Sequence, residues 1–287
     1  MKQSNLKEYF RPQSLAEACK ILLEYKENIM PIAGGTDIFT ANHLEISALL
    51  DVDSLGLAYI KETNGEIIIG ASTSFADIIE SPVIKNHFTA LWEAAKVLAD
   101  MTTRNMATIG GNICTALPSG DSISPLFAAN ASLVLVSASG ERSVEAKDFF
   151  RGPRQTVLVN GELLKEIVVK KTACGSAFEK MGRNSEDLAI ANVAAYLQLS
   201  PDGAIADIRI AHGAVAPTVV YAESLQKELI GKKPDAALLD KLAHLVEEAI
   251  SPIDNVRATA AYRRECSKAL MKRAVRRAYE YARGGLQ

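Results

Sequence analysis

The sequence predicts an α+β fold built in two parts, and three observations lead to this prediction. Helix-like and strand-like patterns are interspersed as far as the polar, turn-prone stretch Lys170–Gly175, where the character of the chain changes. Beyond that stretch, three strand patterns in succession predict an antiparallel meander. Two amphipathic helical patterns then follow. The strands are expected at Gly175–Lys180, Ala189–Leu199 and Ile205–Ala211, and the helices at Asp235–Ile250 and Tyr262–Tyr281.

The first part opens with a helix, followed by a strand that runs into a glycine turn. Ser14 is typical of a helix N-cap, and Glu17 three residues later forms a capping box for a helix over Ser14–Tyr25. Its apolar side carries Leu15, Ala18, Cys19, Leu22 and Leu23. The other predicted elements are strands at Met30–Ala33, Leu49–Val52, Glu66–Ile69, Ser132–Ser137 and Leu163–Val169, and helices at Ser74–Glu80 and Leu91–Leu98.

The two C-terminal helices differ in charge. Asp235 is typical of an N-cap for the first of them, whose apolar stripe consists of Leu238, Leu242, Leu245, Val246 and Ala249. The second carries many Lys and Arg residues and few acids. Because it lacks interleaved aromatic side chains that would stack on bases, a solvated face or a docking surface for another subunit is favoured over nucleic-acid binding.

Composition excludes several classes of protein. The chain has 287 residues, is 48% hydrophobic and carries a formal net charge of −2, so no overall charge attracts it to nucleic acid or to an anionic membrane. The first eight residues lack the apolar core of a leader, and no run approaches the roughly 18–20 apolar residues of a membrane helix. We therefore expect a cytoplasmic protein. The four cysteines are scattered without metal-ligand spacing, which predicts neither zinc nor an iron–sulfur cluster on this chain.

Two segments far apart in the sequence each contain a pair of adjacent glycines. The first is Ile32–Asp37 and the second is Thr108–Asn112. A lone glycine pair is most often a simple turn, but without Cβ atoms the backbone N–H groups can also point into one concavity that suits a phosphate oxygen. Two such turns suit the two phosphates of a dinucleotide. Neither has the spacing of a Rossmann or Walker motif, so the usual nicotinamide or ATP folds are not indicated.

Taken together, the two glycine segments and a series of shorter motifs resemble the FAD-binding subunit of molybdenum hydroxylases, the family of the xanthine dehydrogenase and carbon monoxide dehydrogenase flavoproteins. The resemblance covers nearly the whole chain. The matching motifs are Phe10–Pro12, Ala33–Asp37, Arg104–Asn112 with Pro118 and Asp121, Phe149–Gly152, Glu162–Leu164, Phe178–Lys180 with Arg183 and Asp187, Ile208–Pro217, Ile253–Asp254 and Tyr262–Arg264.

This resemblance implies an FAD-binding domain of the vanillyl-alcohol-oxidase (PCMH) type over residues 1–172, with subdomains of about 1–55 and 56–172. A smaller α+β domain, with an antiparallel sheet and helices, would follow over residues 173–287. It also implies that both glycine turns bind the diphosphate of FAD, that Asp121 accepts a hydrogen bond from a ribityl or ribose hydroxyl, and that Lys180 lies near the isoalloxazine. The implied cofactor-binding residues are Ile32, Ala33, Gly34, Gly35, Thr36, Asp37, Thr108, Gly110, Gly111, Asn112, Thr115, Asp121, Leu164 and Lys180.

The function implied by the resemblance is electron transfer within a heteromeric complex. A molybdopterin-binding large subunit would hydroxylate the substrate, a [2Fe–2S] small subunit would carry the electrons, and this chain would pass them through FAD to NAD+ or another acceptor. No catalytic or metal-binding residue is assigned to the chain itself, and a homodimer is the expected state without partners. Two alternatives stay open: a self-contained FAD-dependent oxidoreductase of the same cofactor fold, and a nucleic-acid-binding or scaffold protein that uses the basic last helix.

Overall fold

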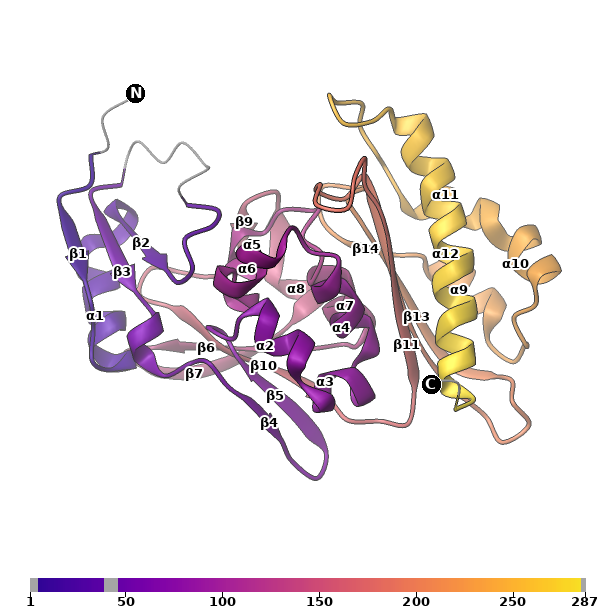
Figure 1. The fold of residues 1–287 in the computed structure, drawn as a ribbon, viewed down its shortest axis with the longest axis horizontal. Coiled ribbons are helices and arrows are strands. Elements are labelled where there is room, and N and C mark those ends of the chain that lie inside the picture. Colours follow the sequence, from indigo (N-terminus) through magenta and orange to yellow (C-terminus); the bar gives the residue numbers. More distant parts are fainter. Residues whose placement is uncertain (1–4, 39–45, 285–287) are drawn as a thin grey trace.

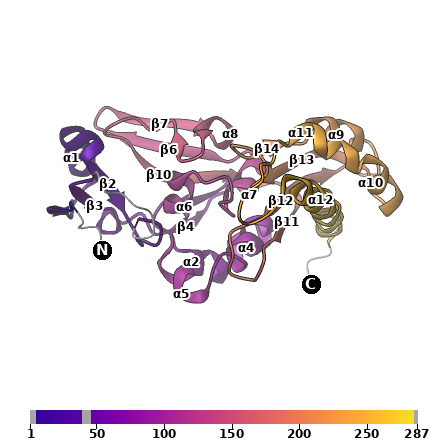
Figure 2. The same cartoon turned by 90° about the horizontal axis from the view of Figure 1, so that it is seen from above.

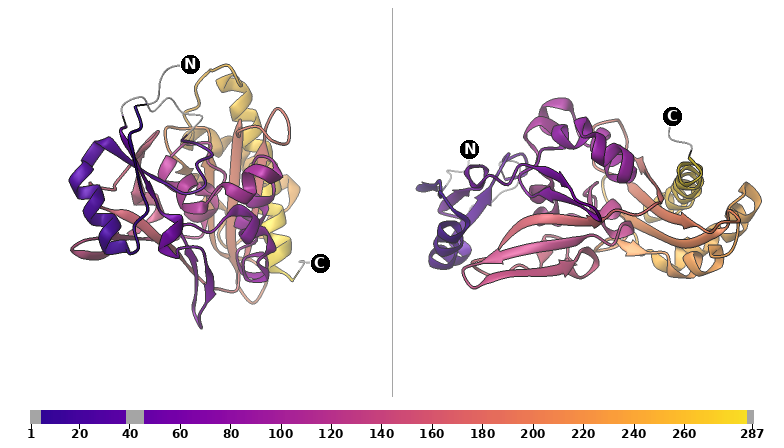
Figure 3. Two further views of the ribbon diagram at one scale, coloured as in Figure 1. Left: turned by 60° about the vertical axis from the view of Figure 1, so that its left-hand side comes forward. Right: turned by 90° about the horizontal axis from the view of Figure 1, so that it is seen from below.

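The computed structural model describes residues 5–38 and 46–284, and the fold is α+β. Three units follow one another along its longest axis (Figure 1): a small N-terminal sheet, a central sheet with helices, and a C-terminal sheet with the last helix. Figure 3 shows the same order from two further sides. The expectation that the chain has no leader rests on residues 1–8, and residues 1–4 lie outside the described residues. Along 5–38 and 46–284, none of the helices is both long and apolar enough to traverse a bilayer.

The N-terminal unit is a parallel sheet in the order β1–β3–β2, covered by α1. Ser14 caps α1 through the amide of Glu17, as predicted, but the Glu17 carboxylate accepts from the amide of Gln13 instead of closing a box on the cap residue. The predicted apolar side is wrong at Leu23, which is 47% exposed. The elements are β1 (Glu8–Phe10), α1 (Leu15–Tyr25), η1 (Lys26–Asn28), β2 (Ile29–Ile32), β3 (Ala48–Asp51) and η2 (Asp53–Leu55).

The central unit is an antiparallel sheet in the order β4–β5–β10–β6–β7, with short helices packed on one face (Figure 2). Its core is aliphatic and aromatic, with Phe75, Phe88 and Phe149 fully buried. The predicted strands at 66–69, 132–137 and 163–169 are confirmed. The strands are β4 (Ile60–Glu62), β5 (Glu66–Gly70), β6 (Ser132–Ser137), β7 (Gly140–Glu145) and β10 (Leu163–Lys170), with the separate hairpin β8 (Phe150–Gly152) and β9 (Gln155–Thr156).

The helices of the central unit are short, and some of them begin at a side-chain cap. Ser74 and Asp77 form a reciprocal capping box at the start of α2, which was predicted, whereas α5, capped by Asp100, was not. The predicted helix over 91–98 is displaced toward the N-terminus. The helices are α2 (Phe75–Glu80), α3 (Pro82–His87), α4 (Thr89–Lys96), α5 (Met101–Met106), α6 (Ile109–Thr115), α7 (Ile123–Ala128) and α8 (Ala146–Phe149).

The C-terminal unit is the predicted antiparallel meander β11–β12–β13, extended by the short β14. Alternate side chains divide between two cores: Phe178 packs against the central unit, whereas Ala177 packs beneath α12. The sheet is therefore held between α4 and α7 on one face and α12 on the other. Its elements are β11 (Gly175–Met181), β12 (Ala191–Leu199), β13 (Ile205–Gly213), β14 (Val220–Tyr221), α9 (Glu223–Leu229), α10 (Ala236–Leu242), η3 (Ala243–Leu245), α11 (Val246–Ala249) and α12 (Ala260–Ala282).

The predicted single helix over 235–250 is wrong, because a 3₁₀ turn divides it into α10 and α11. Its cap is confirmed, since the Asp235 carboxylate accepts from the amide of Leu238 at 2.7 Å. The predicted stripe is displaced by one residue at its start, where Leu239 is buried and Leu238 only partly so. On the basic last helix, Lys268 pairs with Glu247 and Lys272 pairs with Asp240. Part of its positive charge is therefore neutralised within the chain.

A polar cluster joins the central and C-terminal units. The buried Glu93 on α4 accepts hydrogen bonds from the amide of Phe178, from Arg277 on α12 and from the hydroxyl of Tyr281. Arg277 also donates to Glu179 at 2.6 Å. Burial raises the pKa of Glu93, and the Arg277 charge opposes this shift. Because Glu179 precedes Lys180 on β11, the cluster fixes the strand that carries one of the predicted site residues.

Candidate functional site

A cavity of about 530 Å³ lies where the three units meet. Its volume is in the range of cofactor pockets. Both glycine segments line it, and so do all the residues that the resemblance implies, except Ile32. Ile32 is instead buried in a small apolar cluster with Ile46 and Leu49. The prediction that Ile32 belongs to the site is therefore corrected. Ile32 packs in the core beside the glycine turn and does not line the cavity.

The first glycine segment is a turn at the end of β2, as expected. An added Cβ on Gly34 would overlap the carbonyl oxygen of Met106, so only glycine allows this turn to lie against the chain that leads into the second segment. Gly35 adopts a left-handed conformation with φ +68°, which a side chain would strain. Within residues 5–38 and 46–284, the amides of Gly34 and Gly35 have no hydrogen-bond partner. They are therefore free to bind an acceptor in the cavity.

The second glycine segment is the beginning of a helix and not a turn. Thr108 is the N-cap of α6, and its hydroxyl oxygen accepts from the amide of Gly111 at 3.1 Å. The neighbouring amides are also used: Ile109 donates to the carbonyl of Thr73, and Gly110 to that of Ala71. The Asn112 amide donates to the Thr108 carbonyl. The amides of residues 109–112 are therefore already bonded within the chain, unlike the open amides that the sequence predicts for a diphosphate site.

Close packing explains why glycine is needed in the second segment. An added Cβ on Gly110 would lie 2.6 Å from the carbonyl oxygen of Ala71, so α6 packs directly on the chain that leaves β5. Gly111 faces the cavity, and the nearest atom to an added Cβ there is the Thr108 hydroxyl at 3.0 Å. The two glycines thus bring a helix backbone to the cavity wall. The absence of side chains at Gly110 and Gly111 lets α6 approach Ala71 and the cavity closely, while the amides of both glycines are bonded within the chain.

A buried ion pair occupies one end of the cavity. Lys180 donates to Asp121 at 2.6 Å and to the carbonyl of Val97 at 3.0 Å, and both charged side chains are at most 7% exposed. Asn192 lies 3.4 Å from the other carboxylate oxygen of Asp121 and is itself held by Ser124. Burial raises the pKa of Asp121 to about 6, and the Lys180 charge opposes this shift. The sequence indicated both residues but not that their charges neutralise each other.

The C-terminal unit braces the loop that carries Asp121. The Ala214 amide donates to the carbonyl of Pro118 at 2.7 Å, and Ala214 is held at φ +64°. Arg263, which is 4% exposed, donates to the carbonyls of Ala214 and Ile190 and to the Asn255 side chain. Among the described residues no acid pairs with Arg263. Arg263 therefore stabilises the loop indirectly, because it holds Ala214, whose amide binds Pro118.

Several lining residues carry no signal that sequence reasoning could have used. Ala99 has φ +43° and Arg154 has φ +60°, conformations that are uncommon for residues with a side chain. Ser72 is 7% exposed, and its hydroxyl has no hydrogen-bond partner in the described part of the chain. The apolar members missed are Leu57, Leu98, Leu117, Leu158 and Leu163. Leu163 begins β10 and the others lie in loops, and only the tertiary fold brings these separate segments together.

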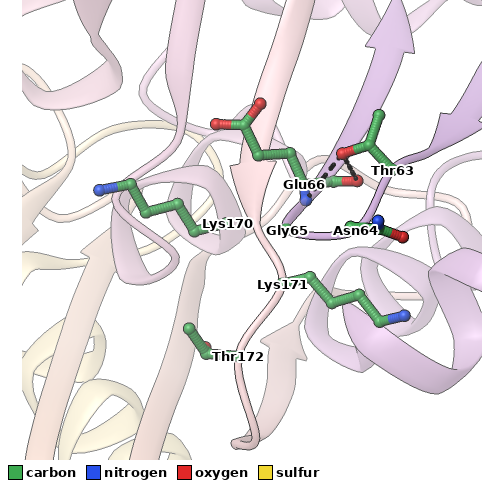
Figure 4. Close-up of a pocket in the computed structure, with 7 residues that line it drawn as sticks. All are labelled: Thr63, Asn64, Gly65, Glu66, Lys170, Lys171 and Thr172. Atoms are coloured by element: carbon green, nitrogen blue, oxygen red, sulfur yellow. Dashed lines mark hydrogen bonds between the residues drawn. The ribbon is translucent and has the colours of Figure 1, made fainter.

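A second hollow lies at the tip of the β4–β5 hairpin and beside the end of β10 (Figure 4). Its side chains do not converge: in the close-up Lys170 and Lys171 extend in opposite directions, and Thr63 bonds only to Glu66. Lys171 also pairs with Glu62. This hollow is open to solvent, so we assign it no role.

Comparison with known proteins agrees with the division of the fold. Residues 3–170 match the family model described as the FAD binding domain in molybdopterin dehydrogenase. Residues 176–278 match the CO dehydrogenase flavoprotein C-terminal domain. The glyceraldehyde dehydrogenase medium chain of Sulfolobus acidocaldarius is 36% identical over 271 residues, covering 93% of this chain and 96% of that protein.

Other relatives have similar sequence identity to this chain. The carbon monoxide dehydrogenase medium chain of Hydrogenophaga pseudoflava is 32% identical, with 95% of this chain and 96% of that protein covered. Among solved structures, a chain of the reconstituted CO dehydrogenase from Oligotropha carboxidovorans superposes with a TM-score of 0.92 at 30% identity, covering 97% of this chain and 99% of that chain. The similarity therefore extends over both parts of the fold.

Proposed function

The chain belongs to the family of FAD-binding subunits of molybdenum hydroxylases, and from this premise we propose that it relays electrons between a [2Fe–2S] subunit and a terminal acceptor. It is a subunit of an FAD-dependent oxidoreductase. In this proposal a molybdopterin-binding large subunit hydroxylates the organic substrate, and NAD+ is the first acceptor to test. The observation that carries the proposal is the meeting of two distant glycine segments at one cavity.

The lining of the cavity fits FAD. The unpaired amides of Gly34 and Gly35 suit the oxygens of a diphosphate, and each hydrogen bond to a charged oxygen contributes about 1.5–3 kcal/mol. The Thr108 hydroxyl, which accepts from Gly111, retains its own hydrogen for an acceptor in the cavity. The orphaned hydroxyl of Ser72 is a further donor on this wall. Leucines on several sides offer apolar surface for two ring systems.

FAD supplies the electron exchange, and this chain binds and orients it. We propose that Asp121 accepts a ribityl or ribose hydroxyl and that Lys180 lies near the isoalloxazine. Because Lys180 and Asp121 neutralise each other, they offer the flavin a polar but nearly uncharged contact. Any cation effect on the reduced flavin would then depend on the protonation state of Asp121. We assign no catalytic acid or base to this chain.

The organisation into domains is part of the proposal. We propose that residues 1–172 form an FAD-binding domain of the vanillyl-alcohol-oxidase (PCMH) type, with its subdomains dividing near residue 55, and that residues 173–287 form the second domain. The parallel sheet β1–β3–β2 and the central antiparallel sheet support the two subdomains. The cavity between them and the C-terminal sheet supports a cofactor held at their junction.

An absorption spectrum of the purified chain before and after denaturation tests the cofactor. Release of FAD, rather than FMN or no flavin, is the expected result. The relay is tested in the complex that copurifies with the chain: chemical reduction of its iron–sulfur centres should bleach the flavin, and NAD+ should restore the colour. If the isolated chain instead oxidises an organic substrate without any partner, it is a self-contained oxidoreductase and the relay is wrong.

A further inference from the structure

Two cations line the cavity among the described residues, and only one of them is paired. Lys180 is neutralised by Asp121 at 2.6 Å. Arg154 has no hydrogen bond, ion pair or ring contact through its side chain in the described part of the chain. The acids Glu162 and Asp187 on the same lining are already bound to Arg142 and Arg183. The guanidinium of Arg154 is therefore available to a ligand.

The backbone of Arg154 is fixed at the end of α6. Its amide donates to the carbonyl of Ala116 at 2.9 Å, and Ala116 is the C-cap of that helix. Both residues are left-handed, with φ +60° for Arg154 and +50° for Ala116. Side chains in this region are strained, and such strain persists where the surrounding structure requires the position. Arg154 is thus mounted at the opposite end of the helix from the glycine pair.

The distance along α6 separates Arg154 from the diphosphate site. The helix has seven residues, which correspond to a rise of about 10 Å. That is roughly the span from a diphosphate to the base of its nucleotide. The lining that Arg154 shares also contains Leu158, Leu163 and Leu164, together with the Asp121–Lys180 pair. An apolar wall with a planar cation suits a flat heteroaromatic ring.

We propose that Arg154 holds the adenine of FAD by stacking its guanidinium on the ring, and that the site prefers FAD over FMN through this contact. The inference rests on the proposed placement of FAD in the cavity. It assigns a specificity-determining role to a residue in the β8–β9 hairpin that lies outside both glycine segments. FMN lacks the adenylate half of FAD, so comparison of the two flavins assigns the contact to that half, and adenosine, which carries no phosphate, separates the adenine from the phosphate.

The experiment measures dissociation constants of the flavin-free chain for FAD and FMN by quenching of flavin fluorescence. Arg154→Met should weaken FAD binding about two- to five-fold, as expected for loss of one cation–π contact by an exposed side chain, and should leave FMN binding unchanged. Arg154→Lys should fall between the two. Adenosine should compete with FAD for the unsubstituted chain, and its competition should weaken in the Met variant.

Arg151→Met is the matched control, because Arg151 is exposed, lies in the same hairpin and does not line the cavity. It should bind both flavins as the unsubstituted chain does. Equal weakening of FAD and FMN by Arg154→Met would overturn the proposal and place Arg154 on the FMN half, and unchanged competition by adenosine would place it on the adenylate phosphate. Unchanged FAD binding in Arg154→Met, or the same loss in Arg151→Met, would also overturn it. Failure of the proposed function is distinct: there the unsubstituted chain would bind neither flavin.

Discussion

The two glycine segments line the same cavity but contribute to it in different ways. In the first, at the end of β2, the amides of Gly34 and Gly35 have no partner within the described residues. In the second, at the start of α6, the amides of Gly110 and Gly111 are bonded to Ala71 and to the Thr108 side chain. A strand that ends in a turn leaves its donors open, whereas a capped helix start satisfies them.

The difference shows that glycine serves two separate physical needs at one site. In the first segment it frees backbone donors and permits a left-handed conformation at Gly35. In the second it removes side-chain volume, so that a helix approaches both Ala71 and the cavity. A phosphate-binding role for paired glycines therefore depends on the element they belong to. Substitutions that affect donors and substitutions that affect volume should separate the two segments.

The largest effect is expected from Gly34→Ala. The added Cβ would overlap the Met106 carbonyl oxygen, which belongs to the backbone and cannot rotate away. We expect a loss of about 4 kcal/mol or more in the free energy of unfolding, together with complete loss of FAD. Urea denaturation and the flavin absorbance of the purified chain measure the two effects.

A matched control for Gly34→Ala is Gly65→Ala, in the β4–β5 hairpin. Nothing lies within 4 Å of an added Cβ at Gly65. This variant should unfold at nearly the same urea concentration as the unsubstituted chain and stay yellow. A Gly34→Ala chain that retains both its stability and its flavin would mean that the first segment does not pack against Met106.

The stability of the fold is expected to depend on pH through the buried Asp121–Lys180 pair, which lies near the second segment. Lys180→Met removes the cation that opposes the raised pKa of Asp121, so this pKa should rise further above about 6. A carboxyl group with a raised pKa stabilises the fold below its unfolded value and loses that contribution as the pH rises through the folded value. The variant should therefore be less stable by about 3 kcal/mol at pH 8 and by clearly less at pH 5.

Urea denaturation at both pH values checks this expectation. The double variant Asp121→Asn, Lys180→Met is the control, because without a carboxyl group the added pH dependence should disappear. A deficit of equal size at pH 5 and pH 8 in the single variant would mean that the cost is lost packing and not an unpaired charge.

Regular elements with a strong side-chain period were predictable from the sequence, and contact-dependent features were not. The strands β10 to β13 and the helix α12 follow their apolar patterns. By contrast, Thr108–Asn112 reads as a turn because two glycines disfavour a helix, yet the close packing of Gly110 on Ala71 and the Thr108 cap make it one. Local propensity carries no information about such a contact.

The candidate site shows the same limit. The residues of the two glycine segments, Asp121 and Lys180 were predictable because they lie in recognisable motifs. The bond between Asp121 and Lys180 was not, since it requires β11 to pass beside the loop after α6. Ser72 and Arg154 stand in no motif, and only their position on the cavity wall points to a role.

A smaller effect is expected from Gly111→Val, which tests volume without removing a free donor. The branched side chain would extend into the cavity, and its Cβ would lie 3.0 Å from the movable Thr108 hydroxyl. We expect a folded chain whose FAD affinity falls by about 1–3 kcal/mol, the usual cost of an added side chain in a tightly packed place. Fluorescence titration measures the loss, and Gly111→Ala should show less of it. A Val variant that stays fully yellow would mean that the second segment does not face the cofactor.

The smallest effect is expected from Thr108→Ala, because the second segment contributes a side-chain hydroxyl instead of open amides. Loss of the cap should lower the free energy of unfolding by about 1 kcal/mol, since Gly111 loses its acceptor. FAD affinity should fall only a few-fold, because the Gly34 and Gly35 amides remain, and Thr108→Ser should restore both quantities. If Thr108→Ala instead lost its flavin as completely as Gly34→Ala, the two segments would be equal partners in diphosphate binding, and the distinction between open and satisfied amides would not govern the site.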